Sequence, residues 1–206
     1  MELEALFRRL EGVRAPAWAP GHPFVAPHRV LGAVLEALAE YDPAAAAKAE
    51  GLAELSEEAL AERLAAALEG TADGSEAEAF VLQAMLRAYA RGLGEETEAE
   101  GARCPICGGL ADVAYLDQDG FRHLVCGVCD SRWPAPRIGC PYCGETDAKK
   151  LRYYPYDPHY RLYECQTCGA TLPAVDLREA GRLNLPRLRA AAVEMRFLLE
   201  SGAVEG

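Results

Sequence analysis

The chain has 206 residues, of which 21 are Lys or Arg and 32 are Asp or Glu, so its formal net charge is −11. This length is enough for one or two domains, and a chain of this size can fold without disulfides. The whole excess of negative charge lies in residues 1–100, which hold 8 basic and 19 acidic residues. That imbalance argues against a broad nucleic-acid-binding surface in this half.

The sequence has no feature typical of insertion into a membrane or transport across one. No uncharged apolar run approaches the length of about 18 residues that indicates a membrane-spanning helix. The N-terminal stretch MELEALFRRLEG has the pattern of an amphipathic helix and lacks the basic and apolar regions of a signal peptide. We therefore expect a cytoplasmic protein, where cysteines serve as metal ligands more often than as disulfides.

Residues 1–98 are rich in Ala, Leu and Glu and predict an α-helical domain. A Pro-rich stretch at 15–27 interrupts the pattern, and we expect it to be extended on the surface. Beyond it, Ser56 is a candidate N-cap, and Ser75 with Glu78 has capping-box spacing. The acidic residues at 95–100 are predicted to be a solvated linker.

The composition of the sequence changes abruptly beyond the acidic residues at 95–100. Short β-type runs, tyrosines and Gly turns replace the Ala-rich pattern, and Asp119-Gly120 between two apolar runs predicts a β-hairpin. A last helix is predicted from about Pro186 to Leu199, because a proline stands at its start and Gly202 just beyond its end.

The main signal is the set of eight cysteines, which all fall in C-x2-C pairs between residues 104 and 168. The pairs are Cys104/Cys107, Cys126/Cys129, Cys140/Cys143 and Cys165/Cys168. Two intervening residues allow a tight turn, here called a knuckle, that directs both sulfurs at one metal ion about 2.3 Å away. Gly108, Gly144 and Gly169 each follow a pair directly and suit the positive φ that such turns need. Four knuckles predict two tetrahedral sites with four sulfur ligands each.

Four knuckles can be joined in three ways, and we favour consecutive pairing because each half then has its own hairpin. The first site would use Cys104, Cys107, Cys126 and Cys129, with 18 residues between its knuckles. The second would use Cys140, Cys143, Cys165 and Cys168, with 21 residues between them. The first spacing lies within the common zinc pattern of about 15 to 20 residues, and the second exceeds it slightly.

Spacing leaves the metal open between zinc and a rubredoxin-type iron, since both accept four sulfurs in a tetrahedron. Such a site has no open position, so we do not expect catalytic zinc. No Ser/His/Asp or Cys/His constellation, phosphate loop or paired-carboxylate motif stands out. We expect neither catalytic residues nor an enzyme.

Five tyrosines cluster in the stretch LRYYPYDPHYRLYEC at 151–165. They can pack over a small ribbon, form a partner-binding surface, or stack on bases. The net charge of −11 and the absence of a basic stripe disfavour nucleic acid.

The motifs resemble the formate dehydrogenase accessory protein family, FdhE, over roughly residues 103–200. The resemblance is carried by Cys104-Pro-Ile-Cys107-Gly108, by Arg122-His123-Leu124-Val125-Cys126, and by Trp133, Arg137 and the remaining cysteine pairs. It implies an accessory protein that binds the molybdenum- or tungsten-containing catalytic subunit of formate dehydrogenase and supports its maturation. It also implies that all eight cysteines hold two metal ions, iron or zinc. The alternative is a small rubredoxin-like electron-transfer protein.

The expected fold is therefore α+β, with two tandem rubredoxin-like or zinc-ribbon modules after the helical domain. The expected boundaries are 1–98 for the helical domain, 103–133 and 134–175 for the two four-cysteine ribbons, and 184–201 for the C-terminal helix. Trp133 and Arg137 lie in the bridge between the ribbons. They either fill and tie this joint or contact the client enzyme, since Trp and Arg are common interface anchors.

Overall fold

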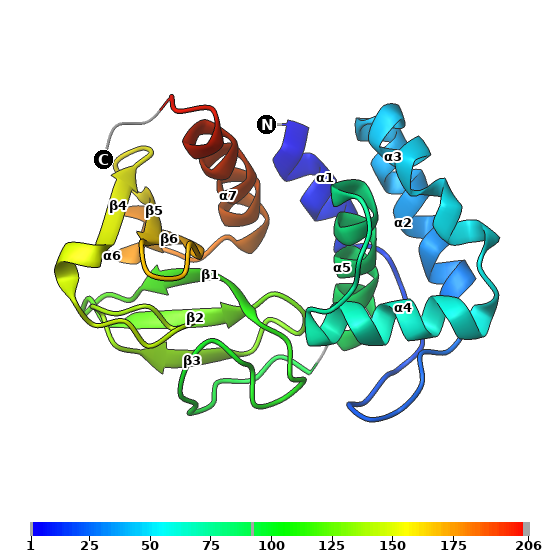
Figure 1. Cartoon of the computed structure of the whole chain (residues 1–206), viewed down its shortest axis with the longest axis horizontal. Coiled ribbons are helices and arrows are strands. Elements are labelled where there is room, and N and C mark those ends of the chain that lie inside the picture. The colour runs from blue at the N-terminus through cyan, green and yellow to red at the C-terminus, as the bar shows by residue number, and fades with distance from the viewer. Residues whose placement is uncertain (1, 92, 204–206) are drawn as a thin grey trace. The chain divides into compact units, whose positions relative to one another are not determined.

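A computed structural model describes residues 2–91 and 93–203 (Figure 1). It divides into two compact units. The helical unit comprises Met1–Gly94, Ile106–Leu110 and Gly127–Asp130. The sheet unit comprises Glu95–Pro105, Ala111–Cys126 and Ser131–Gly206. The domain boundaries expected from the sequence stay predictions.

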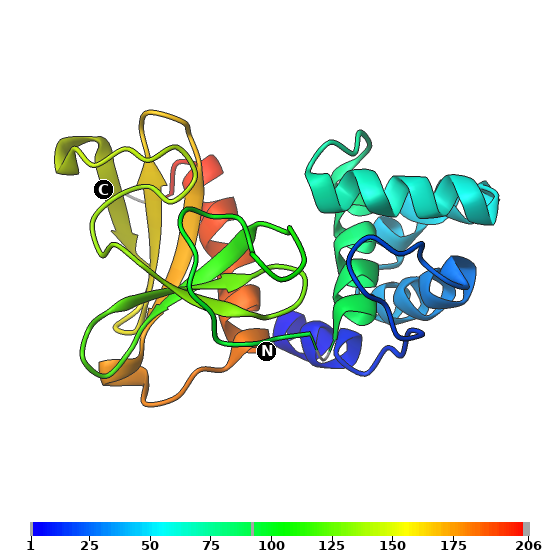
Figure 2. The ribbon, with the colours of Figure 1, turned by 90° about the horizontal axis from the view of Figure 1, so that it is seen from below.

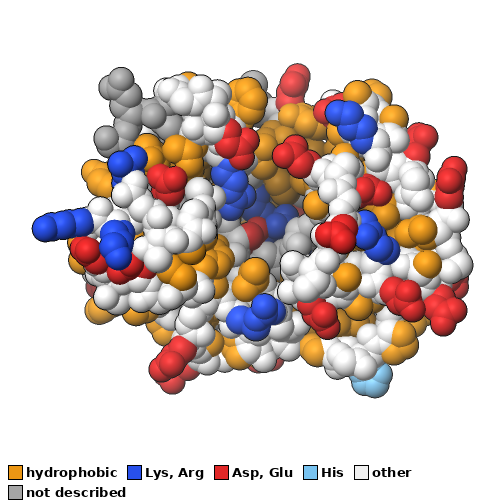
Figure 3. Space-filling view, viewed as in Figure 1, with side chains coloured by type: hydrophobic (Ala, Val, Ile, Leu, Met, Phe, Trp, Pro, Cys, Tyr) orange, Lys and Arg blue, Asp and Glu red, His pale blue; other side chains and the backbone are white. Residues whose placement is uncertain are grey.

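The helical unit is built from amphipathic helices around an apolar core. Its elements are α1 (Glu2–Leu10), α2 (Pro27–Tyr41), α3 (Pro43–Ala49), the 3-10 helix η1 (Glu50–Glu54), α4 (Glu57–Glu69) and α5 (Glu76–Ala90). Leu31, Leu64 and Met85 are among the fully buried side chains that join these helices. Acidic side chains are spread over the exposed surface on the right of Figure 3.

Side-chain caps fix where several of these helices begin. The Ser56 hydroxyl accepts from the Ala59 amide at 3.1 Å, and Ser75 and Glu78 form the predicted reciprocal capping box. Asp42 ends α2 and also begins α3, because its side chain accepts from the Ala45 amide at 2.9 Å. A cap of this kind contributes about 1 kcal/mol.

The Pro-rich stretch is more deeply anchored than predicted. Trp18 and Phe24 are both buried and stack with ring centroids 5.1 Å apart. Phe24 also meets the ring of Tyr89 on α5 at 5.0 Å, and the Tyr89 hydroxyl donates to the Val25 carbonyl at 2.6 Å. The prediction of a surface segment was wrong for these aromatic side chains, because burying large rings outweighs the extended character of the backbone.

The sheet unit contains one six-stranded sheet with the order β3-β2-β1-β6-β5-β4. Its strands are β1 (Ala111–Leu116), β2 (Arg122–Cys126), β3 (Arg132–Ala135), β4 (Leu151–Pro155), β5 (Tyr160–Cys165) and β6 (Thr171–Asp176). Each half is antiparallel, and β1 and β6 join the halves as a parallel pair with Ala114 opposite Ala174. The duplication seen in the cysteine pattern thus becomes one continuous sheet.

One face of the sheet is covered by helix α7 (Leu185–Glu200), which follows the short α6 (Leu177–Ala180) (Figure 2). Leu188 and Met195 of α7 pack with Tyr154, Leu162 and Val175 in the core of this unit. The predicted C-terminal helix is confirmed within one residue at each end. Because strand side chains alternate between faces, these strand residues define the face that α7 covers.

The acidic residues at 95–100 have exposed carboxylates, but their backbone is not a free linker. The Arg132 amide donates to the Glu95 carbonyl at 2.7 Å, and the Thr97 amide donates to the Arg132 carbonyl at 2.9 Å. The segment therefore runs beside β3 and takes up backbone hydrogen bonds of this edge strand that would otherwise be open to pairing with another strand.

The α+β fold class predicted from the sequence is confirmed. A helical region, a sheet carrying two four-cysteine groups, and a C-terminal helix follow one another in the predicted order. Among the described residues, no helix combines the length and apolar character that crossing a membrane requires.

Candidate metal centres

Three of the knuckles share one backbone hydrogen bond, and all four end in a residue with positive φ. The amides of Cys126, Cys140 and Cys165 each donate to the carbonyl five residues later, at 2.8 to 3.0 Å. The residue after each knuckle has a positive φ, as predicted for Gly108, Gly144 and Gly169, at 80°, 78° and 73°. Asp130 takes the same place in the remaining knuckle, with φ of 62°. Asp is one of the few non-glycine residues that adopt this conformation at low cost.

The knuckles bring the cysteine sulfurs together in the two predicted groups. Within each group of four, the sulfur atoms all lie within 4.8 Å of one another. In the second group, the Sγ atoms of Cys140 and Cys168 are 3.7 Å apart, as are those of Cys143 and Cys165. A tetrahedron with metal–sulfur bonds of about 2.3 Å has edges of about 3.8 Å. Both groups could hold a metal ion, and two sulfur–sulfur distances of the second group match this edge length.

The two groups differ in exposure to solvent. All four cysteines of the first group are buried, whereas Cys143 and Cys168 of the second group are exposed. Burial controls how readily water, chelators and electron-transfer partners reach a sulfur ligand. The second group is the more accessible of the two.

The thiols of the second group also differ in pKa. Burial raises the pKa of Cys140 to about 12. Burial also disfavours the Cys165 thiolate, but the amides of Cys168 and Thr167 and the Cys143 thiol lower the pKa of Cys165 to about 7. Amides that point at a sulfur stabilise its anionic form, which is the form that binds a metal ion.

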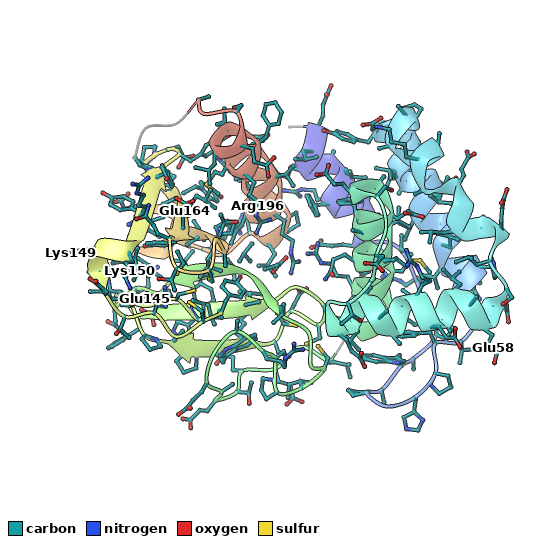
Figure 4. All side chains as sticks on the ribbon, in the orientation of Figure 1. Glu58, Glu145, Lys149, Lys150, Glu164 and Arg196 are labelled. Carbon is teal, nitrogen blue, oxygen red and sulfur yellow. The ribbon has the colours of Figure 1, made fainter. Side chains whose placement is uncertain are left out.

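Glu145, which is labelled in Figure 4, ties the two knuckles of the second group together through its side-chain hydrogen bonds. Its Oε2 accepts from the Thr167 hydroxyl at 2.6 Å and from Lys150 Nζ at 3.0 Å. The Thr167 hydroxyl, followed by the Asp147 amide and Lys150, lowers the pKa of Glu145 to about 2. The sequence pattern did not single out this carboxylate, although its place two residues after Cys143 is typical of residues that support a metal site.

The Cys126–Cys129 knuckle of the first group is held by side chains of helix α5. Its tip, Gly127–Asp130, belongs to the same helical unit as α5. Gln83 Nε2 and Arg87 Nε of α5 both donate to the Gly127 carbonyl at 2.6 Å. Gly94 approaches the same turn so closely that an added Cβ would lie 2.7 Å from the Cys129 carbonyl oxygen. A side chain at position 94 would therefore displace this turn.

Helix α7 supports the strands that carry both groups through two arginines. Arg189 is buried, and its Nε donates to Asp112 of β1 at 3.0 Å while its Nη2 donates to the Cys126 carbonyl at 3.3 Å. Arg196 donates to Thr171 at the start of β6 at 3.2 Å and to the Asp112 carbonyl at 3.3 Å. The helical pattern alone predicts arginines on the solvent side, so these roles were missed.

The other residues singled out in the sequence fall mostly into structural positions. Trp133 is 1% exposed, and its Nε1 donates to the Gly101 carbonyl at 3.0 Å. Arg137 is exposed and donates to the Gly120 carbonyl at 2.8 Å. These contacts favour a structural role for both residues, with Trp133 buried and Arg137 paired with a backbone carbonyl. Among the tyrosines, Tyr154 and Tyr160 lie in the core under α7, while Tyr153 is 57% exposed.

The donor set determines the chemistry that these groups could support. Four thiolates around a divalent or trivalent ion leave no open position for a substrate, and they suit zinc or a single iron. Zinc would hold each pair of knuckles together, whereas iron would add one-electron chemistry. The sulfur spacing fits both ions.

Comparisons with known proteins show what this arrangement is similar to. The family model described as "FdhE, central domain" matches residues 103–137. The crystal structure of the FdhE protein from Pseudomonas aeruginosa superposes with a TM-score of 0.58, covering 97% of this chain and 75% of that chain at 28% identity. The chain is therefore similar to the FdhE family in both sequence and fold.

Curated sequences named for FdhE show the same similarity. A "Protein FdhE homolog" of Aquifex aeolicus is 31% identical over 91 residues, which are 41% of this chain and 32% of that protein. One from Yersinia enterocolitica is 28% identical over 106 residues, or 50% of this chain and 33% of that protein. The chain thus matches about a third of the length of these curated relatives.

Proposed function

We propose that this protein is a formate dehydrogenase accessory protein, which binds the catalytic subunit of that enzyme and supports its maturation. The observation that carries the proposal is the match to the P. aeruginosa FdhE structure over 97% of this chain, together with the two four-cysteine groups. The proposed role is non-catalytic and cytoplasmic, and the client is a molybdenum- or tungsten-containing subunit.

In this proposal all eight cysteines hold two metal ions that organise the binding surface. The ligands are Cys104, Cys107, Cys126 and Cys129 in the first site and Cys140, Cys143, Cys165 and Cys168 in the second. A metal ion in each group would fix the distance between its two knuckles, and hence the loops around them. The acidic character of the chain, at −11, supports a protein client and disfavours nucleic acid.

The test is an anaerobic pull-down from the native host with the tagged full-length chain. The bait proteins are the wild type, Cys126→Ser and the control Lys149→Ala, which changes an exposed lysine remote from the first group. We expect mass spectrometry to identify the formate dehydrogenase catalytic subunit with the wild type and the control, and to find it depleted with Cys126→Ser. In a strain lacking this chain, the catalytic subunit should accumulate without activity.

Two outcomes contradict parts of the proposal. Clean recovery of a different redox enzyme would keep an accessory role but replace the client. Full formate dehydrogenase activity in the strain lacking this chain would overturn the maturation role itself.

A second candidate function is one-electron transfer, and the exposure of Cys143 and Cys168 favours it. A sulfur ligand at the surface gives a short path for an electron to or from a bound iron. The check is the metal content after anaerobic preparation from iron-replete cells, followed by a redox titration. Zinc in both sites would exclude this function, and a reversible iron couple would support it.

A further inference from the structure

A pocket lies on the face of the sheet opposite α7. Tyr154, Leu162 and Val175 face the helix, so their strand neighbours Tyr153, Tyr163 and Leu172 point to the other side. These three line a pocket of about 640 Å³, including its open mouth, together with residues of the bridge at 137–142. The pocket belongs entirely to the sheet unit.

The pocket contains a buried cation whose hydrogen bonding is incomplete. Arg122 lines it, is 3% exposed, and donates from Nη2 to the Gly139 carbonyl at 2.9 Å. Its buried Nε has no acceptor among the residues that the structure describes. No described carboxylate forms an ion pair with this guanidinium, and its burial lowers the pKa of Arg122. A buried charge left in this state is costly unless an anion completes it.

The other residues that line the pocket indicate which kind of molecule would carry the anionic group. Ile138 and Tyr153 are 62% and 57% exposed, and the lining is mostly apolar. Arg137 adds a second positive charge at the pocket, whereas Cys140 and Cys165, which also line it, would add negative charge as thiolates of a metal-loaded second group. This balance favours a ligand with a single negative charge over a doubly charged phosphate.

We propose that this pocket binds a carboxylate carried on an apolar group, with Arg122 as its charged partner and Ile138 and Tyr153 against its apolar part. A planar guanidinium suits a carboxylate, and exposed aromatic and aliphatic walls suit a ring or an alkyl chain. The carboxylate can belong to a free organic acid or to the C-terminus of a peptide. The proposal is independent of the accessory function, because it concerns the isolated chain.

The experiment is a titration of the zinc-loaded full-length chain with hydrocinnamate, followed by NMR of backbone amides and arginine Nε–H groups. The neutral hydrocinnamamide is the matched probe without charge. We expect a Kd of about 1 mM for the acid, which is typical of so small a ligand. The Arg122 Nε–H signal should shift when hydrocinnamate binds. Hydrocinnamamide should bind more weakly by about tenfold or by a larger factor, because a charge-assisted hydrogen bond is lost.

Two variants and a control localise the binding. Arg122→Met should weaken hydrocinnamate by about tenfold or more. Ile138→Asp, at an exposed position where folding is not at risk, should weaken it by placing a like charge at the mouth. The control Arg182→Met removes an exposed arginine that does not line the pocket and should leave the Kd unchanged.

Peptides that end in Phe, with a free or an amidated C-terminus, distinguish the two sources of the carboxylate. Tighter binding of the free-acid peptide than of hydrocinnamate would identify a chain terminus as the ligand, and weaker binding would identify a small acid. Equal binding of hydrocinnamate and its amide would overturn the proposal, as would a Kd unaffected by Ile138→Asp. Absence of any shift would assign Arg122 solely to the Cys140 side of the pocket, as a counter-charge to the thiolates, and would also overturn it.

Discussion

The Thr167 hydroxyl donates a 2.6 Å hydrogen bond to Glu145 Oε2, and this bond joins the two knuckles of the second four-cysteine group. Thr167 lies inside the Cys165–Cys168 knuckle, and Glu145 lies two residues beyond the Cys140–Cys143 knuckle. Strands β4 and β5, which lie near these knuckles in the chain, are also paired, but this bond joins the two turns directly through side chains. It restrains the distance between two pairs of metal ligands.

Thr167→Val should therefore weaken metal binding at the second site. Supporting hydrogen bonds around metal ligands are worth about tenfold or more in affinity. We expect zinc release to a chromogenic chelator to be about tenfold faster for one of the two ions. Thr146→Val is the control, because it changes a nearby exposed threonine outside this bond. Equal release rates for both variants would show that the strands alone position the knuckles.

Cys126→Ser should remove one metal ion and leave the other. The variant changes only a member of the first sulfur group, and the second group keeps all four thiolates. Elemental analysis should find about one ion per chain in place of two, and Cys165→Ser should give the reciprocal result. Loss of both ions from either variant would contradict independent sites.

Arg189→Met should destabilise the sheet unit by about 3 kcal/mol, because it leaves Asp112 without its buried ion-pair partner. Arg187→Met is the matched control two residues away. Arg187 is exposed and its guanidinium lies over the Tyr160 ring, 5.6 Å from the ring centroid, so we expect a loss of about 1 kcal/mol or less. Urea unfolding of the two metal-loaded variants makes the comparison. Equal losses would show that the Arg189 ion pair adds no net stability.

Asp176→Asn should destabilise the protein at neutral pH but not in acid. Hydrogen bonds from Arg178, together with the charge of Arg161, hold the pKa of Asp176 below its usual value of 3.8. A lowered pKa in the folded state contributes stability that is complete above pH 3.8 and is lost as the pH falls through the folded-state value. The difference in unfolding free energy between wild type and variant should therefore shrink as the pH falls below 3.8.

The difference between the two proteins is the quantity to measure, because metal ligands also take up protons in this range. Both proteins carry the same cysteines, so that contribution cancels. A difference that stays constant from neutral to acid pH would show that the Asp176 charge does not provide the stability.

The sequence was informative wherever the structure depends on local spacing. The C-x2-C pairs, the glycines after them and the Ser75 capping box each involve residues close in the chain, so the pattern contains the whole constraint. The same holds for the hairpin around Asp119-Gly120 and for the limits of α7.

Contacts between distant segments could not be read in this way. Ala114 and Ala174 pair across 60 residues, and the alternation of apolar side chains does not say which strands are neighbours. Arg189 reads as a solvent-exposed residue of a helix, yet its partner Asp112 lies 77 residues earlier. The prolines around Trp18 and Phe24 predicted a surface position for these side chains. Their burial depends on packing against Tyr89, which is distant in the sequence. Packing of this kind depends on the tertiary structure.

The parallel pairing of β1 with β6 has a consequence for how the chain folds during synthesis. The first and the last strand made are neighbours at the centre of the sheet, so the sheet is completed only after Asp176 has left the ribosome. Helices α1–α5 are made earlier and form through contacts between nearby segments, which close quickly. Until β6 arrives, β1 has an unpaired edge, and the half of the sheet beside the second four-cysteine group is incomplete. During that interval the nascent chain is most vulnerable to mispairing.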